Sequence, residues 1–284
     1  MRARTEEQRL ADLHCHSTVS DGQLEPWQVV ELAARQGLHV VALTDHDTVA
    51  GVEPARQRAR ALGLEVVPAL ELSTAWGAQE IHLLGYFVDV AAPPLLRELQ
   101  RQQEARWQRA RLMARRLAAL GYPISWARVR ELAGQGTVGR VHLARALVEA
   151  GHVASMGQAF DQFLAEGRPA YVPQARLTVQ EGIGLIAAAG GVPVLAHPGL
   201  AQVDHLIPAW KAQGLAGLEV VHPAHDSQQE AHYLRLAQEW DLLPTGGSDA
   251  HGRERPEDQP GAVRVPLAWV EGLRRVATRP SRRP

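Results

Sequence analysis

Several histidines and carboxylates of this 284-residue chain lie within or just after short apolar runs. His14 and His16 are two residues apart. In an extended strand such residues point to the same face, so both imidazoles can bind one ion while Cys15 points away. Imidazole nitrogens and carboxylate oxygens together are ligands that suit Mn, Zn or Fe. The pattern predicts a site for divalent metal ions. The candidate ligands are His14, His16, Asp21, His46, Glu71, His82, His197, Asp249 and His251.

Each of these motifs alone is modest evidence, because a lone pair of histidines or a carboxylate at a strand end is commonly structural. Together they favour a metal site, since burying several imidazoles and acids side by side without a counter-charge is costly. Clustered divalent ions lower the pKa of a bound water and neutralise phosphoryl oxygens as charge develops. We therefore expect a metal-dependent phosphoric ester hydrolase. Asp12 and Asp45, next to candidate ligands, are expected either to orient imidazoles or to satisfy backbone groups.

The apolar runs that must position these residues alternate with amphipathic segments. The expected strands are 10–13, 39–43, 65–70, 81–87, 192–196, 218–221, 242–245 and 262–265, and the expected helices between them include 27–36, 179–189 and 227–240. Such alternation predicts parallel strands and an α/β fold. Seven or eight strands suit a barrel better than a short open sheet. The carboxyl ends of barrel strands share the rim where active sites lie, so we expect the candidate ligands there.

One region departs from this alternation, and we expect no strand in it. Between residues 93 and 173, helical patterns cover 95–120, 126–132, 141–150 and 156–164. We predict a helical insert at 93–173 that separates the two parts of one α/β domain, 1–92 and 174–284. Pro93-Pro94 at one end and Pro169 with Pro173 at the other are the expected hinges.

Composition sets a few further limits. The formal net charge is −1, which gives no electrostatic argument for or against a polyanionic partner. Cys15 is the single cysteine, so no internal disulfide is possible. The N-terminus lacks the apolar core of a targeting peptide, and the longest apolar stretch, 183–196, is shorter than the ~20 residues of a membrane span. We expect a cytoplasmic protein with no membrane contact and no obligate protein partner.

Four segments of the chain resemble the motifs of the polymerase and histidinol phosphatase (PHP) family, in that family's order. They are DLHCHSTVSDG, ALTDHDT, LAHPG and TGGSDAHG. The resemblance implies a distorted (β/α)7 barrel of the PHP type with a trinuclear metal centre. Manganese is the expected metal, with zinc or iron as the alternatives. The resemblance implies one metal site at His14, His16, Glu71 and Asp249, a second at Glu71, His82 and His197, and a third at Asp21, His46 and His251.

The composition of the predicted insert bears on the identity of the substrate. Between Arg97 and Arg130 it holds nine arginines, against only Glu98 and Glu104. These arginines are expected either to form a solvated helical face or to make a basic lid that holds a second phosphate or an RNA backbone.

The segments around Arg140 and Arg168 resemble the PHP branch that removes the 3′-phosphate of nucleoside 3′,5′-bisphosphates. Some members of that branch also shorten 5′-phosphorylated RNA from its 5′ end. The resemblance implies that Arg140 and Arg168 bind the 5′-phosphate, and His225 is a candidate for contact with the leaving group or a phosphate. The expected partner is a phosphorylated nucleotide or a short RNA. One alternative is a phosphatase of small monoesters such as histidinol phosphate, which leaves both arginines unexplained. The other is a metal-binding regulatory module without turnover.

Overall fold

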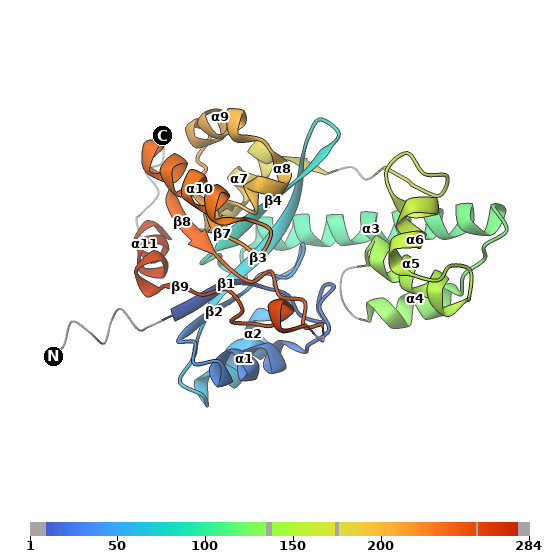
Figure 1. Ribbon diagram of the computed structural model, residues 1–284, viewed down its shortest axis with the longest axis horizontal. Helices are drawn as coiled ribbons and strands as arrows, with labels where there is room; N and C mark the ends of the chain where they lie inside the picture. Colours follow the sequence, from blue (N-terminus) through green and yellow to red (C-terminus); the bar gives the residue numbers. More distant parts are fainter. Residues whose placement is uncertain (1–9, 135–137, 174–175, 254, 278–284) are drawn as a thin grey trace.

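The computed structural model describes residues 10–134, 138–173, 176–253 and 255–277 (Figure 1). Within these residues nine strands form one sheet, in the order β8-β7-β6-β4-β3-β2-β1-β9, with β5 paired to β3. The strands are β1 (Leu10–Cys15), β2 (Val40–Leu43), β3 (Glu65–Trp76), β4 (Gln79–Tyr86), β5 (Leu177–Thr178), β6 (Val192–Leu195), β7 (Gly217–Val221), β8 (Leu243–Gly246) and β9 (Val265–Pro266).

The sheet curls into a nearly closed barrel. Strands β1, β2 and β3 are parallel neighbours, as are β6, β7 and β8. Just beyond β8, Ala250 forms a parallel bridge with Cys15 of β1, and its carbonyl accepts the His16 N–H at 2.9 Å. This bridge joins the two ends of the sheet at one rim. The predicted α/β barrel is confirmed.

Two strands depart from the parallel arrangement that the sequence predicted. β4 lies antiparallel between β3 and β6, and the short β9 is antiparallel to β1. Only Gly77 and Ala78 separate β3 from β4, and Trp76 pairs directly with Gln79. A parallel crossover needs a dozen or more residues, so this connection can only be a hairpin. Gly77 supplies the positive φ of 60° that the tight turn requires.

Helices cover the outside of the barrel. They are α1 (Pro26–Arg35), α2 (Val52–Arg60), α7 (Val179–Ala188), α8 (Pro198–Ala201), α9 (Ile207–Ala212), α10 (Ser227–Glu239) and α11 (Leu267–Ala277). α1 and α2 bury their apolar stripes with residues of β1 and β2 in one apolar cluster, which includes Val29, Ala55 and Leu43. Short 3-10 turns cover Asp204–Leu206 and Pro256–Asp258. No helix in the described ranges is both long enough and apolar enough to cross a membrane.

Residues 93–173 fold as helices alone in the parts that the structure describes. They form α3 (Pro93–Ala119), α4 (Trp126–Ala133), α5 (Arg140–Glu149), α6 (Met156–Ala159) and a π-helical turn at Phe160–Leu164. α3 runs from the barrel out to the other helices, which pack around its far half (Figure 1). Their buried side chains, among them Met113, Leu117, Val129 and Leu147, form an apolar core separate from those of the barrel. Pro93 and Pro94, which we expected at a hinge, begin α3, where proline is well tolerated.

Candidate metal centre

Glu71 lies at the centre of a cluster of imidazoles on the barrel rim. Its side chain is 1% exposed. Its Oε1 atom lies 2.7 Å from Nδ1 of His82 and 3.0 Å from Nε2 of His197. Its Oε2 atom lies 3.2 Å from one ring nitrogen each of His14, His16 and His46. Five histidines from four separate segments of the chain thus converge on one carboxylate.

Three overlapping groups of side chains are close enough to hold metal ions, with all ligand atoms of a group within 4.8 Å of one another. The groups are His14, His16, Glu71 and Asp249; then His16, Asp21, His46 and His251; then His46, Glu71 and His82. The first has the same members as the first site that the sequence implied. The second adds His16 to the implied third site. The third contains His46 where the implied second site has His197, although His197 also touches Glu71. All nine candidate ligands therefore meet in one place, and their role as ligands stays a prediction.

The barrel explains how these residues meet. His14 is in β1 and His16 follows it, while Cys15 between them is buried in the apolar cluster beneath α1. His82 lies near the start of β4. Because β4 is antiparallel to its neighbours, its start lies at the rim where the parallel strands end. Glu71 lies within β3 rather than after it, because β3 extends to Trp76.

Two candidate ligands have strained backbone conformations. His197 has a φ of 28° and Asp249 a φ of 48°, values that residues other than glycine rarely adopt. Such conformations cost free energy and persist where the surrounding structure holds them, often at functional sites. Asp249 Oδ1 lies 3.0 Å from His16 Nε2 and 3.3 Å from His14 Nε2.

Asp12 and Asp45 bind backbone N–H groups and hydroxyls rather than imidazoles. Of the two roles expected for them, orienting imidazoles or satisfying backbone groups, the structure shows the latter. Asp12 accepts hydrogen bonds from the Ser248 N–H (2.9 Å), the Ser248 hydroxyl (2.6 Å) and the Gly261 N–H (2.7 Å). Asp45 accepts from the Ser17 N–H (2.7 Å) and hydroxyl (2.7 Å) and from the Ser20 hydroxyl (2.6 Å). Both carboxylates therefore hold together the loops that carry the candidate ligands.

Glu219 fills the role expected of those two aspartates, and the sequence reasoning missed it. It lies in β7 with a side chain 0% exposed. Its Oε1 lies 2.9 Å from His14 Nδ1, and its Oε2 accepts the backbone N–H of His197 at 2.8 Å. The signal was present, because Glu219 is an acid inside the otherwise apolar strand Gly217–Val221. A buried acid in such a strand needs a partner.

The charges of the cluster suit cations. Burial alone would raise the pKa of Glu71, but the imidazoles of His46, His82 and His14 hold it well below its usual value. The pKa of Asp249 is likewise low, because His14 and His16 outweigh its burial. In the described part of the chain, Nδ1 of His16 and Oδ1 of Asp21 are shut off from solvent without a hydrogen-bond partner. Ionised acids and buried ligand atoms without hydrogen bonds fit divalent ions.

Beside the cluster lies a cavity of about 180 Å³ with a strongly basic wall. The candidate ligands Asp21, His46 and His82 line this cavity. Its lining also includes Glu80 and four arginines, namely Arg106, Arg109, Arg140 and Arg176. Burial lowers the pKa of Arg109 to about 10, and the positive charges of Arg140, Arg176 and Arg106 act in the same direction. Arginines gathered in this way form a place where an anion is stabilised.

Other side chains fix the arginines of this wall. Arg176 pairs with Glu80 at 2.7 Å, and Arg140 lies over the rings of Phe160 (5.6 Å) and Tyr171 (5.9 Å). Arg106 pairs with the buried Asp47 and donates to the Ser73 hydroxyl at 2.7 Å, which ties α3 to the barrel. Arg106, Arg109 and Arg176 were not singled out from the sequence, although the first two belong to its arginine-rich run.

The three predicted substrate residues lie in different surroundings. Arg140 lines the cavity. Arg168 is exposed and is not among the lining residues. His225 is buried between backbone groups, with Nδ1 2.9 Å from the Val220 carbonyl and Nε2 accepting the Gly199 N–H at 3.1 Å. A contact between His225 and substrate would require one of these bonds to open. Their roles in substrate binding stay predictions.

Comparison with known proteins gives matches across most of the chain. Residues 12–131 match the family model of the PHP domain. The chain is 38% identical over 265 residues to a 5′-3′ exoribonuclease of Haemophilus influenzae, covering 92% of each chain. It is 34% identical over 251 residues to a 3′,5′-nucleoside bisphosphate phosphatase of Chromobacterium violaceum, covering 84% of this chain and 86% of that one. A crystal structure from Bifidobacterium adolescentis has a TM-score of 0.86 and 33% identity, over 94% of this chain and 96% of that one.

Proposed function

The chain belongs to the PHP family of metal-dependent phosphoesterases, and from this premise we propose that it cleaves the phosphoester at the 3′ oxygen of a nucleotide that carries a 5′-phosphate. Water attacks phosphorus, the bond between phosphorus and the 3′ oxygen breaks, and that oxygen takes up a proton. With a nucleoside 3′,5′-bisphosphate the products are a nucleoside 5′-monophosphate and phosphate. With a 5′-phosphorylated RNA the same cut releases the first nucleotide and leaves a shortened 5′-phosphorylated RNA, so one site serves both substrates.

The observation that carries this proposal is a single cavity with two kinds of lining residue. Three candidate metal ligands line it, and so do Arg106, Arg109, Arg140 and Arg176. A simple monoester has one phosphate and needs only the metal ligands. The arginines suit a second phosphate on the same substrate, because a guanidinium can bond two phosphate oxygens at once. The relatives named as an exoribonuclease and a bisphosphate phosphatase support the same choice.

We infer that the centre takes three divalent ions, with manganese as the expected metal. The three ligand groups overlap, because Glu71, His16 and His46 each belong to two of them. When bound, such ions supply hydroxide near neutral pH and neutralise the phosphoryl oxygens. Glu219 holds His14 in place beneath them.

The helical insert at 93–173 is, on this proposal, a separate substrate lid. Three of the four cavity arginines, Arg106, Arg109 and Arg140, come from its helices α3 and α5. The barrel then contributes the reacting groups, and the insert selects substrates with a 5′-phosphate. Such substrates occur in the cytoplasm, where we expect the enzyme to act.

The test compares two substrates that differ only in the 5′-phosphate, adenosine 3′,5′-bisphosphate and adenosine 3′-monophosphate. With Mn²⁺ the wild type should prefer the bisphosphate. In Arg140→Ala, kcat/KM for the bisphosphate should fall roughly 10- to 100-fold, as expected for the loss of a charged hydrogen bond of ~1.5–3 kcal/mol. The value for the 3′-monophosphate should change little. Arg168→Ala tests the other predicted arginine in the same way.

Arg145→Ala is the matched control, because Arg145 lies on the same helix with a side chain 58% exposed and pairs with Glu149. It should behave as wild type with both substrates. Equal rates on histidinol phosphate, with Arg140→Ala unchanged, would instead identify a phosphatase of small monoesters. No turnover of any of these substrates by the metal-loaded protein would favour a regulatory module.

A further inference from the structure

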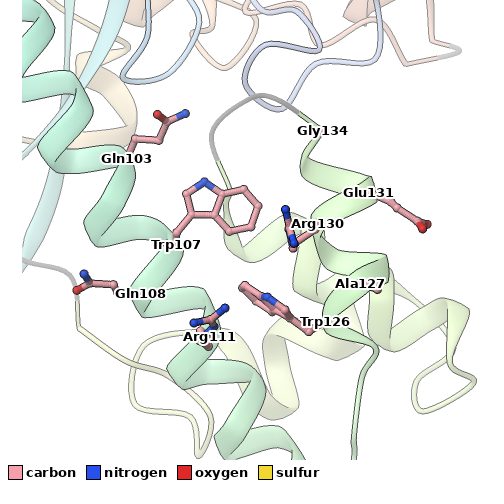
Figure 2. Close-up of a pocket in the computed structure, with 9 residues that line it drawn as sticks. All are labelled: Gln103, Trp107, Gln108, Arg111, Trp126, Ala127, Arg130, Glu131 and Gly134. Carbon is pink, nitrogen blue, oxygen red and sulfur yellow. The ribbon is translucent and has the colours of Figure 1, made fainter.

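A second and larger cavity, of about 830 Å³, lies in the insert between α3 and α4. Figure 2 shows Trp107 of α3 and Trp126 of α4 projecting into the space between the two helices, with Arg111 and Arg130 beside them. The indole centroids are 5.8 Å apart at an interplanar angle of 82°, and the Arg111 guanidinium lies 5.4 Å from the Trp126 ring centroid. We call this cavity the tryptophan cleft, defined by Gln103, Trp107, Arg111, Trp126 and Arg130. Its volume is in the range of sites that bind small organic ligands.

Core packing does not account for the whole of this arrangement. Trp107 and Trp126 are half-buried at the margin of the insert core rather than within it. The Trp126 indole N–H is shut off from solvent and has no acceptor among the described residues. Buried tryptophan N–H groups normally find a partner. The two indole rings are therefore partly available to a ligand, and the Trp126 N–H is a hydrogen-bond donor that core packing leaves without a partner among the described residues.

The cleft is also basic. The Arg111 and Arg130 side chains are exposed, and neither makes an ion pair with a described residue. Glu131 is the one acid among the lining residues that the structure describes, and it pairs with Arg128 at 3.0 Å. The charge available to a ligand in the cleft is therefore positive. This charge and the indoles together suit a ligand with both phosphates and flat rings.

The cleft adjoins the catalytic cavity through α3. Arg106 lines the catalytic cavity, and the next residue, Trp107, lines the cleft. Successive Cα atoms are about 3.8 Å apart, so the two linings share one turn of helix. The catalytic cavity and the tryptophan cleft therefore lie against the same stretch of α3.

Building on the proposed function, we propose that the tryptophan cleft binds the nucleotides of single-stranded RNA that follow the scissile bond. Bases stack on the Trp107 indole and on the Arg111 guanidinium plane, while Arg111 and Arg130 pair with backbone phosphates. Stacking on aromatic and guanidinium planes is how single-stranded nucleic acid is held without sequence preference. A nucleoside bisphosphate bound in the catalytic cavity has no further nucleotide to place in the cleft. The cleft thus separates RNA from mononucleotide substrates.

The experiment measures kcat/KM for adenosine 3′,5′-bisphosphate and for 5′-phosphorylated oligoadenylates of increasing length. In wild type, kcat/KM should rise with length until the cleft is filled. Trp107→Ala and the double variant Arg111→Gln/Arg130→Gln should lower kcat/KM for the longer RNAs about 10-fold, the size typical of losing one stacking or phosphate contact. Both should leave the bisphosphate reaction unchanged, which also shows that the insert is folded.

Two variants serve as controls. Leu112→Ala removes an exposed side chain of α3 that is not among the cleft residues, and Arg235→Gln removes an exposed arginine of α10. Both should match wild type on every substrate. Equal losses on bisphosphate and RNA in Trp107→Ala, or unchanged RNA rates in both cleft variants, would overturn the inference.

A binding measurement separates this inference from the proposed function. Fluorescently labelled oligoadenylate is titrated with protein in chelator, so that no turnover is needed, and anisotropy reports the Kd. Weaker binding of the oligoadenylate by the cleft variants supports RNA binding in the cleft. If wild type binds in this way but hydrolyses none of the substrates, the proposed function is refuted and the inference about the cleft is not. Equal affinity of wild type and variants, or equal affinity for duplex RNA of the same length, would count against the cleft.

Discussion

At the scale of single residues, the candidate centre is organised by two buried acids. Glu71 contacts five imidazoles directly. Behind it, Glu219 contacts the outer nitrogen of His14 and the backbone of His197. Glu219 thereby sets the ring orientation of His14 in β1 and the backbone position of His197 after β6. Carboxylates that bond the outer nitrogen of a ligand histidine fix its tautomer and raise its basicity.

We predict that Glu219→Gln weakens metal binding and lowers kcat, each by about 10- to 100-fold. The amide keeps the size of the side chain but removes the charge that holds His14. Titration of the metal-free protein with Mn²⁺, followed by activity at saturating metal, measures both effects. Glu239→Gln, an exposed acid at the end of α10, is the control and should change neither. Wild-type metal affinity in Glu219→Gln would refute the role assigned to Glu219.

At the scale of elements, α7 shows how closely a helix must approach the strands that carry the site. It begins with a capping box, in which Thr178 Oγ1 accepts the Glu181 N–H at 3.2 Å and Glu181 accepts the Thr178 N–H at 2.8 Å. Its face toward β3 and β4 carries Gly182, where an added Cβ would lie 2.6 Å from Thr74 Cγ2 and 2.9 Å from Leu83 Cδ1. Gly184 on the same helix has nothing within 4 Å of that position.

The two glycines of α7 should respond in opposite directions to alanine. Gly184→Ala should raise the free energy of unfolding by ~0.5–1 kcal/mol, because alanine loses less backbone entropy in an exposed helix position. Gly182→Ala should lower it by ~1–3 kcal/mol, because the new methyl group forces α7 away from the strands. Urea denaturation followed by circular dichroism measures both. A stabilised Gly182→Ala would show that the helix has more room against the strands than these distances allow.

At the scale of the whole molecule, the centre joins segments that lie far apart along the chain. Its candidate ligands come from the ends of the barrel sheet as well as its middle, from His14 to His251. Ligands bound across such separations stabilise the folded state, because the unfolded chain does not present them together. Ion binding and barrel closure should therefore be coupled.

We predict that a chelator lowers the Tm of the protein by about 5 °C or more and that Mn²⁺ restores it. An ion at 100 times its Kd contributes ~2.7 kcal/mol, and ~1 kcal/mol shifts the Tm of a protein of comparable size by ~2–4 °C. Differential scanning calorimetry gives the values. In His16→Ala, which removes a member of two ligand groups, the shift with chelator should be much smaller. An identical Tm with and without chelator in the wild type would contradict the coupling.

The sequence by itself determined the fold class, the helical character of the insert and the list of residues that gather at the rim. Each follows from local physics. Strand and helix periodicities reflect which side chains share a face, and His14 and His16 must point the same way in any extended segment. Polar residues placed after apolar strands meet wherever those strands pack side by side, which accounts for the candidates that follow β1, β2, β6 and β8. The resemblance to the PHP motifs supplied the full set of nine.

Only the tertiary structure decided the direction of β4, the buried role of Glu219, and which arginines line the cavity. The insert offered nine arginines between Arg97 and Arg130, and sequence spacing cannot say which of them α3 turns toward the barrel. That choice depends on how α3 packs on the rim, where Arg106 pairs with Asp47, and on the path that brings Arg140 and Arg176 to the same wall while Arg168 stays exposed. The distance between two residues far apart in the chain depends on how every element between them packs. A local sequence pattern does not contain this information.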